Sequence, residues 1–276
     1  MGASEPVAAL HVLGIPVEPT LLERWRGWYC HPQQPFRVDT LPARWRPSLP
    51  EPTPGGVPAD LEAVAETRDT FFMYGGGEWV WLGERDLADA DPELRRWLVA
   101  ERRRRIVPKP APVWPSHPAV TAALVRWIEQ GCRTSLHSLA AGSLAAAAKV
   151  LPGAADLAGT FPDGSGANCF GTVMAASGQS TAESWVGPDA FTAWLDDHTS
   201  PVTAAAHDDA NSRPGTVLVW HERGALAHAA ITLGEGWALH KPSQAWCSPR
   251  IVVRVEELIH SWVYPGARLS RHRLST

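Results

Sequence analysis

The last third of the chain contains four short apolar stretches separated by turn signals, and this pattern constrains the fold more than any other feature. The stretches cover residues 216–220, 227–233, 237–240 and 250–255. Short apolar runs bounded by turn residues are typical of strands. The Gly-Glu-Gly segment at 234–236 is typical of a hairpin turn. We therefore expect an antiparallel sheet in this part of the chain.

Helical patterns precede the sheet. The expected helices cover residues 117–130, 135–151, 169–176 and 189–195. In the first of them Val120, Leu124 and Ile128 recur on one face. Helices followed by an antiparallel sheet predict an α+β fold.

A proline-dense segment at residues 108–115 is the best candidate for a domain boundary, because such segments are stiff and extended. We place the border near residue 112. Residues 1–112 then form an N-terminal region of unknown type, and residues 113–276 form a second domain. In the first region we expect helices over residues 20–29, 60–65 and 92–105 and a hairpin over residues 70–82.

Composition excludes several classes of protein. The chain has 276 residues and a formal net charge of −4, which gives no case for a nucleic-acid partner. No apolar run approaches the roughly 20 residues that span a bilayer, and no secretory signal opens the sequence, so we expect a cytoplasmic protein without a membrane partner. The four cysteines form no CxxC motif, and no set of residues at ligand spacing indicates a metal or another cofactor.

One cysteine lies where thiol chemistry is favoured. Cys169 follows a glycine-rich run and starts the expected helix over residues 169–176. Free N–H groups and the helix dipole at such a position favour the thiolate, which is the nucleophilic form. His228 and His240 lie on the two expected strands that flank the Gly-Glu-Gly turn, so their rings can approach each other. A cysteine with two histidines predicts a nucleophile, a general base and a residue that orients the base.

These segments resemble the NlpC/P60 superfamily of papain-like cysteine peptidases and amidases. The resemblance covers roughly residues 115–265 and is carried by Asn-Cys-Phe-Gly at 168–171, Arg-Pro-Gly-Thr-Val-Leu-Val-Trp at 213–220, Ala-His-Ala-Ala-Ile-Thr-Leu-Gly-Glu-Gly at 227–236 and Ala-Leu-His at 238–240. It implies a papain-like fold in which helices pack on an antiparallel sheet. It also implies Cys169 as the nucleophile, His228 as the general base and His240 as the residue that orients it.

The resemblance implies a cysteine-dependent hydrolase of peptide or acyl amides, or an acyl or peptidyl transferase, that works through a thioester. The substrate would be a small-molecule or peptide amide or ester. We assign Asn168, Phe170 and Trp237 as candidate substrate-binding residues, and the N-terminal region as a possible cap on the cleft. The absence of an export signal favours a biosynthetic role inside the cell. The alternative is a catalytically inactive papain-like binding module.

Overall fold

The protein has an α+β fold of mixed helix and antiparallel sheet. The computed structural model describes residues 10–103, 112–203, 205 and 207–275. The chain divides into two compact units. The first holds residues up to Val12 together with Val17–Gly131, and the second holds Leu13–Pro16 together with Cys132–Thr276.

The division falls after Gly131 instead of near residue 112. The reason is the amphipathic helix α5 (Val120–Gly131), which buries Leu124 and Ile128 within the first unit. The ring of Trp127 in this helix lies 5.4 Å from that of Tyr29 in the same unit. The proline-dense segment lies mostly outside the described residues. The helix expected over residues 117–130 is confirmed.

The first unit combines short helices with small sheets. Its elements are β1 (Leu10–Val12), α1 (Pro19–Tyr29), β3 (Gln33–Arg37), α2 (Val64–Phe71), β4 (Trp79–Gly83), α3 (Glu84–Asp89), α4 (Pro92–Arg103) and α5, with 3-10 turns at Ala43–Ser48 and Pro54–Gly56. The strand β2 (Ile15–Val17) pairs with β1. The helices expected over residues 20–29 and 92–105 are confirmed for the residues described.

The hairpin expected over residues 70–82 is wrong. Phe71 is the last residue of α2, and Phe72 caps that helix in the left-handed conformation, with φ of 50°. The helix expected over residues 60–65 therefore lies further along the chain, as α2. β4 pairs with the distant β3, with Phe36 opposite Val80, rather than with the segment just before it. A glycine run marks a chain reversal but does not determine which strand becomes the partner.

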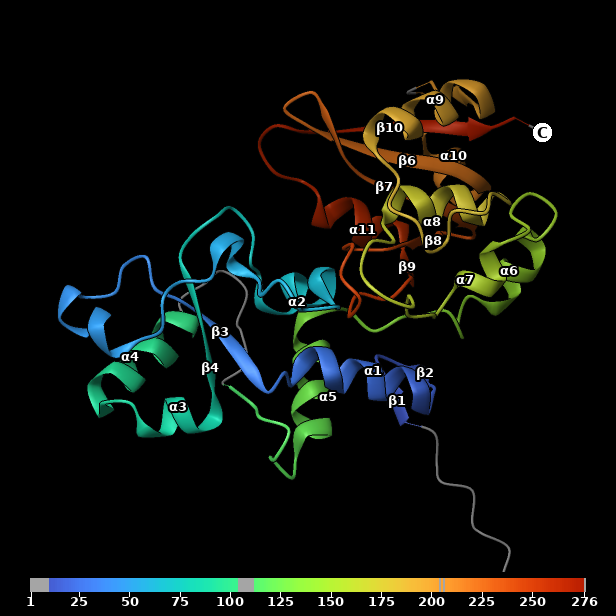
Figure 1. Ribbon diagram of the computed structural model, residues 1–276. Coiled ribbons are helices and arrows are strands. Elements are labelled where there is room, and N and C mark those ends of the chain that lie inside the picture. The colour runs from blue at the N-terminus through green and yellow to red at the C-terminus, as the bar shows by residue number, and fades with distance from the viewer. Residues whose placement is uncertain (1–9, 104–111, 204, 206, 276) are drawn as a thin grey trace, which may run out of the picture. The chain divides into compact units, whose positions relative to one another are not determined.

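The second unit is built on one six-stranded antiparallel sheet in the order β5-β10-β6-β7-β8-β9 (Figure 1). Its strands are β5 (Thr199–Pro201), β6 (Pro214–Glu222), β7 (Ala225–Gly234), β8 (Trp237–His240), β9 (Ile251–Arg254) and β10 (Ala267–Leu274). Its helices are α6 (Ala141–Ala147), α7 (Ala154–Leu157), α8 (Cys169–Ala176), α9 (Pro188–His198), α10 (His207–Ser212) and α11 (Val255–Ser261). The strands expected in this region are confirmed.

The helix expected over residues 135–151 is shorter than predicted, because it begins only at Ala141. The preceding backbone is engaged with β9. The N–H of Leu136 donates to the carbonyl of Val252 at 2.8 Å, and the N–H of Val252 donates to the hydroxyl of Ser135 at 3.2 Å.

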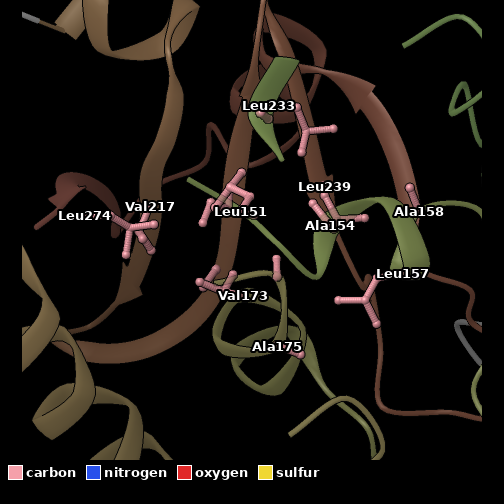
Figure 2. Close-up of a cluster of buried hydrophobic side chains, with 14 of the residues drawn as sticks. Leu151, Ala154, Leu157, Ala158, Val173, Ala175, Val217, Leu233, Leu239 and Leu274 are labelled. Atoms are coloured by element: carbon pink, nitrogen blue, oxygen red, sulfur yellow. The ribbon is translucent and has the colours of Figure 1, made fainter. Parts of the chain in front are cut away.

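Both faces of the sheet carry apolar clusters, and alternate residues of β7 belong to different ones. Ala229 and Ile231 join the cluster that holds α6, α7, α8 and α9, part of which Figure 2 shows around Val173 and Leu239. Ala230 joins the cluster on the other face, which includes Leu258 of α11. Residues in β7 two positions apart share a face, so His228 belongs to the face of Ala230.

Candidate active site

Cys169 is the first residue of α8, and the cap of that helix holds it there. The side-chain oxygen of Asn168 accepts a hydrogen bond from the N–H of Gly171 at 2.9 Å, which is the usual geometry of an N-cap. The amide nitrogen of Asn168 donates to the carbonyl of Val186 at 2.7 Å. These two bonds tie the first turn of α8 to a neighbouring loop. The helix expected over residues 169–176 is confirmed with the same bounds.

The thiol of Cys169 is only partly exposed, and this decides its protonation state. Burial raises the pKa of the Cys169 thiol to about 11. Hydrogen bonds from the backbone N–H groups of Ala229, Phe170 and Cys169 itself act in the opposite direction, as does the charge of Lys241. The N–H groups at the helix N-terminus favour the thiolate as expected, but loss of solvation outweighs them, so the net pKa of the thiol is raised.

His228 and His240 are brought together as the strand pattern predicts. The Nε2 atom of His228 lies 2.9 Å from the Nδ1 atom of His240, and the two rings meet edge to face at 87°. Both side chains are buried. The short turn between β7 and β8 makes this contact possible, because it places the strands side by side.

The sulfur reaches β7 where that strand extends past the end of β8. Ile231 pairs with Leu239, and His240 is the last residue of β8, so β7 extends past the end of β8 from Ala229 back to Ala225. The backbone amide of Ala229 in this extension lies close enough to the sulfur of Cys169 to act on the pKa of the thiol. The thiol thus lies by the amide that follows His228, but it packs on the face of Ala229, whereas the ring of His228 is on the face of Ala230 with Trp220 and Trp262. Among the described residues, the structure joins the two histidines by a hydrogen bond and shows no such bond between the thiol and either ring.

Both histidines are neutral near pH 7. Burial lowers the pKa of His228 to about 4. Burial also lowers the pKa of His240, and the positive charges of His228 and Arg133 act in the same direction. Each ring then carries one proton, and two tautomers fit the 2.9 Å contact. When His228 donates from Nε2, its Nδ1 keeps a lone pair that can accept a proton.

The three candidate substrate-binding residues have structural partners. Asn168 caps α8, and Phe170 is buried and stacks on Phe191 with ring centroids 4.5 Å apart. Trp237 lies at the opposite end of β8 from His240, with the guanidinium of Arg254 3.6 Å from its ring centroid. Their contact with a substrate stays a prediction.

Sequence reasoning missed two neighbours of the site. Trp262 stacks on His228 with centroids 4.8 Å apart. Lys241 is fully buried, and its amino group donates to the carbonyls of Ser243 and Ala245 at 2.5 and 3.0 Å. The position of Lys241 directly after His240 was a usable signal. Trp262 is distant in sequence and gave none.

Two of the other cysteines share the raised thiol pKa of Cys169. All four cysteines are free thiols. Burial raises the pKa of Cys30 and of Cys132 to about 11.

Across the residues that the structure describes, no group of three His, Cys, Asp or Glu side chains could hold a metal ion. In the same residues, no helix has the length and apolar character needed to cross a membrane.

No family model, curated protein or solved structure matches this chain.

Proposed function

We propose that this chain is a cysteine-dependent amide hydrolase or acyl transferase of the NlpC/P60 type, with a papain-like fold in its second unit. The observation that carries the proposal is the contact of two buried imidazoles, one of them on β7, the strand whose Ala229 amide interacts with a helix-terminal thiol. The Nε2 atom of His228 is 2.9 Å from the Nδ1 atom of His240, and the amide that follows His228 acts on the pKa of the Cys169 thiol. A cytoplasmic location and a cleft-capping role for residues 1–112 belong to the same proposal.

The resting pair is neutral, so the proton moves during the reaction. The pKa values of about 11 for Cys169 and about 4 for His228 lie far apart. Transfer of the proton at rest therefore costs on the order of 10 kcal/mol, at about 1.4 kcal/mol for each pKa unit. Two unit charges about 4 Å apart recover only about 4 kcal/mol at an effective dielectric constant of about 20. His228 therefore acts as a general base while the new bond forms.

The proposed reaction has two halves. The sulfur of Cys169 attacks the carbonyl carbon, the thiol proton passes to Nδ1 of His228, and the carbonyl π electrons move to oxygen. The backbone N–H of Cys169 contributes to stabilising this oxyanion. The carbonyl then reforms, the C–N bond breaks, and His228 returns the proton to the leaving amine. Water or an amine attacks the thioester, gives its proton to His228 and displaces Cys169, which takes that proton back.

His240 orients the base in this scheme. The Nδ1 atom of His240 accepts a hydrogen bond from Nε2 of His228. This bond selects the tautomer of His228 whose own Nδ1 carries no proton and can therefore accept one. The same contact holds the ring when His228 carries the extra proton. His240 is a positioning residue rather than a group that contacts the substrate.

The test uses p-nitrophenyl acetate as an acyl donor. We expect a burst of p-nitrophenolate and one acetyl group on Cys169, located by peptide mass spectrometry. Cys169→Ala removes the burst, and His228→Ala reduces its rate, whereas His260→Ala on the exposed side of α11 leaves it unchanged. Acetylation spread over Cys30, Cys132 and Cys247 with Cys169 unmodified would contradict the proposal.

Hydrolase and transferase differ in the second half of the reaction. With hydroxylamine present, a transferase diverts the acetyl group from acetate to the hydroxamate at low amine concentration. A hydrolase releases acetate and shows little diversion.

The second candidate is an inactive binding module, and the observation that favours it is the protonated, partly buried thiol of Cys169. It predicts no acetylation and no effect of Cys169→Ala on any acyl-transfer rate. The same experiment therefore separates the two candidates.

A further inference from the structure

The ring of His228 lies against the face of an indole. Trp262 is nearly parallel to it, at 8° and with ring centroids 4.8 Å apart. The ring of His240 meets His228 at 87°, and that of Trp220 lies at 42° with a centroid separation of 5.6 Å. One face of the imidazole is thus stacked, while its edge is bonded to the second histidine.

The fold holds Trp262 in this position. It is the C-cap residue of α11, and its backbone N–H donates to the carbonyl of Ile259 at 3.1 Å. Its side chain packs on the apolar cluster of Ala230 and Leu258, with Trp220 at a centroid distance of 5.9 Å. The indole is therefore a fixed part of the second unit.

The charges around His228 give its protonated form little support. The titratable group in contact with its ring is His240 from β8, on which the charge of Arg133 also acts, and Tyr264, beyond the indole, hydrogen-bonds Glu222 at 3.5 Å. Within the described part of the chain, no carboxylate hydrogen-bonds His228 or His240. An imidazolium formed here has a neutral histidine at its edge and an indole on its face.

The face of an indole attracts a cation and interacts more weakly with a neutral ring. The stacking contact is therefore stronger after His228 has taken a proton than before. A contact that is stronger in the transition state than in the ground state accelerates the reaction, whereas a contact of equal strength in both states does not.

We propose that Trp262 is a positioning residue that stabilises the protonated form of His228 through the face of its indole. Its catalytic consequence rests on the proposed function. Its effect on the protonation of His228 does not.

The test compares Trp262→Phe and Trp262→Leu with Val263→Ala, which truncates the exposed neighbour and keeps the indole. The pKa of His228 is followed by NMR of histidine labelled at Cε1, over the pH range in which circular dichroism reports the native fold. We expect the pKa of His228 to fall in Trp262→Phe, to fall further in Trp262→Leu, by a few tenths to about one unit, and to stay unchanged in Val263→Ala. If the indole acts only by excluding water, both variants raise the pKa of His228, which would overturn the proposal.

A second measurement avoids any change of shape. Tryptophans with one to four ring fluorines are placed at position 262 alone, which weakens the attraction of the face for a cation. We expect the acetylation rate of Cys169 at pH 7 to fall stepwise, by about 2- to 30-fold in total. An unchanged rate with the tetrafluorinated residue contradicts the proposal. If the protein does not acetylate at all, the proposed function fails, and the NMR titration still tests the role of Trp262.

Discussion

Acid should destabilise this protein because it must protonate a buried histidine. His228 has a pKa of about 4 in the fold, lowered by burial, against 6.5 for the free side chain. The unfolded chain binds this proton more readily than the folded chain, so the stability that depends on a neutral His228 is complete above pH 6.5. It is lost progressively as the pH falls from 6.5 to 4.

The magnitude follows from the two pKa values. When the pH falls from 7 to 4.5, protonation of His228 alone lowers the free energy of unfolding by about 2–3 kcal/mol. The lowered pKa of His240 adds to the loss in the same direction. This is a large share of the 5–15 kcal/mol that is typical of a folded domain.

Urea unfolding at pH 7, 5.5 and 4.5 measures this effect. Wild type and His260→Gln, which changes an exposed residue of α11, should lose stability together. His228→Gln removes the titrating group, so its stability should fall by about 2–3 kcal/mol less over the same range. If wild type and His228→Gln lose stability in parallel, His228 is not the buried neutral group described above.

Three further predictions concern the site itself. The acetylation rate at pH 5 should be about 90 % of that at pH 7.5, because a base with a pKa near 4 is still mostly neutral, whereas a base with an unshifted pKa would retain only about 3 %. His240→Ala leaves the buried Nε2 of His228 without its partner and should cost about 1–3 kcal/mol of stability in urea unfolding, together with a slower acetylation, while His240→Asn should recover part of both. Asn168→Ala removes the cap of α8 and should cost about 1 kcal/mol in the same assay, and Asn168→Asp should not restore wild-type stability, because its carboxylate keeps the acceptor for Gly171 but cannot donate to the carbonyl of Val186.

Capping residues and turn glycines in the sequence predicted the helix and the hairpin that carry the candidate site residues. α8 has the bounds expected from the sequence because Asn168 caps its first turn and Gly178, with φ of 104°, follows its end. β8 and its turn were equally readable, since Gly234 and Gly236 both adopt positive φ. The contact between the two histidines follows from that turn, because antiparallel neighbours lie side by side.

Properties that depend on the whole fold were not predictable in this way. The chain shows that Cys169 begins a helix but not how much of the thiol is covered, and the covering reverses the direction of its pKa shift. The partner of β4 is β3, which no local pattern identifies. The stacking of Trp262 on His228 joins the end of α11 to the middle of the sheet, so it appears only when both are folded.

Because the pKa of Cys169 is raised and not lowered, the surroundings must stabilise charge at a different step of the reaction. A thiolate held at rest needs its positive partner before the substrate arrives, and a buried imidazole with a pKa near 4 is a poor one. A neutral pair needs support only while the proton is in transit, when charge develops on His228 and on the substrate oxygen. The neighbours that matter are then those that respond to a developing charge: the edge of His240, the face of Trp262 and the N–H groups that begin α8. The neutral resting pair and the aromatic surroundings of His228 are therefore consistent with the same order of events.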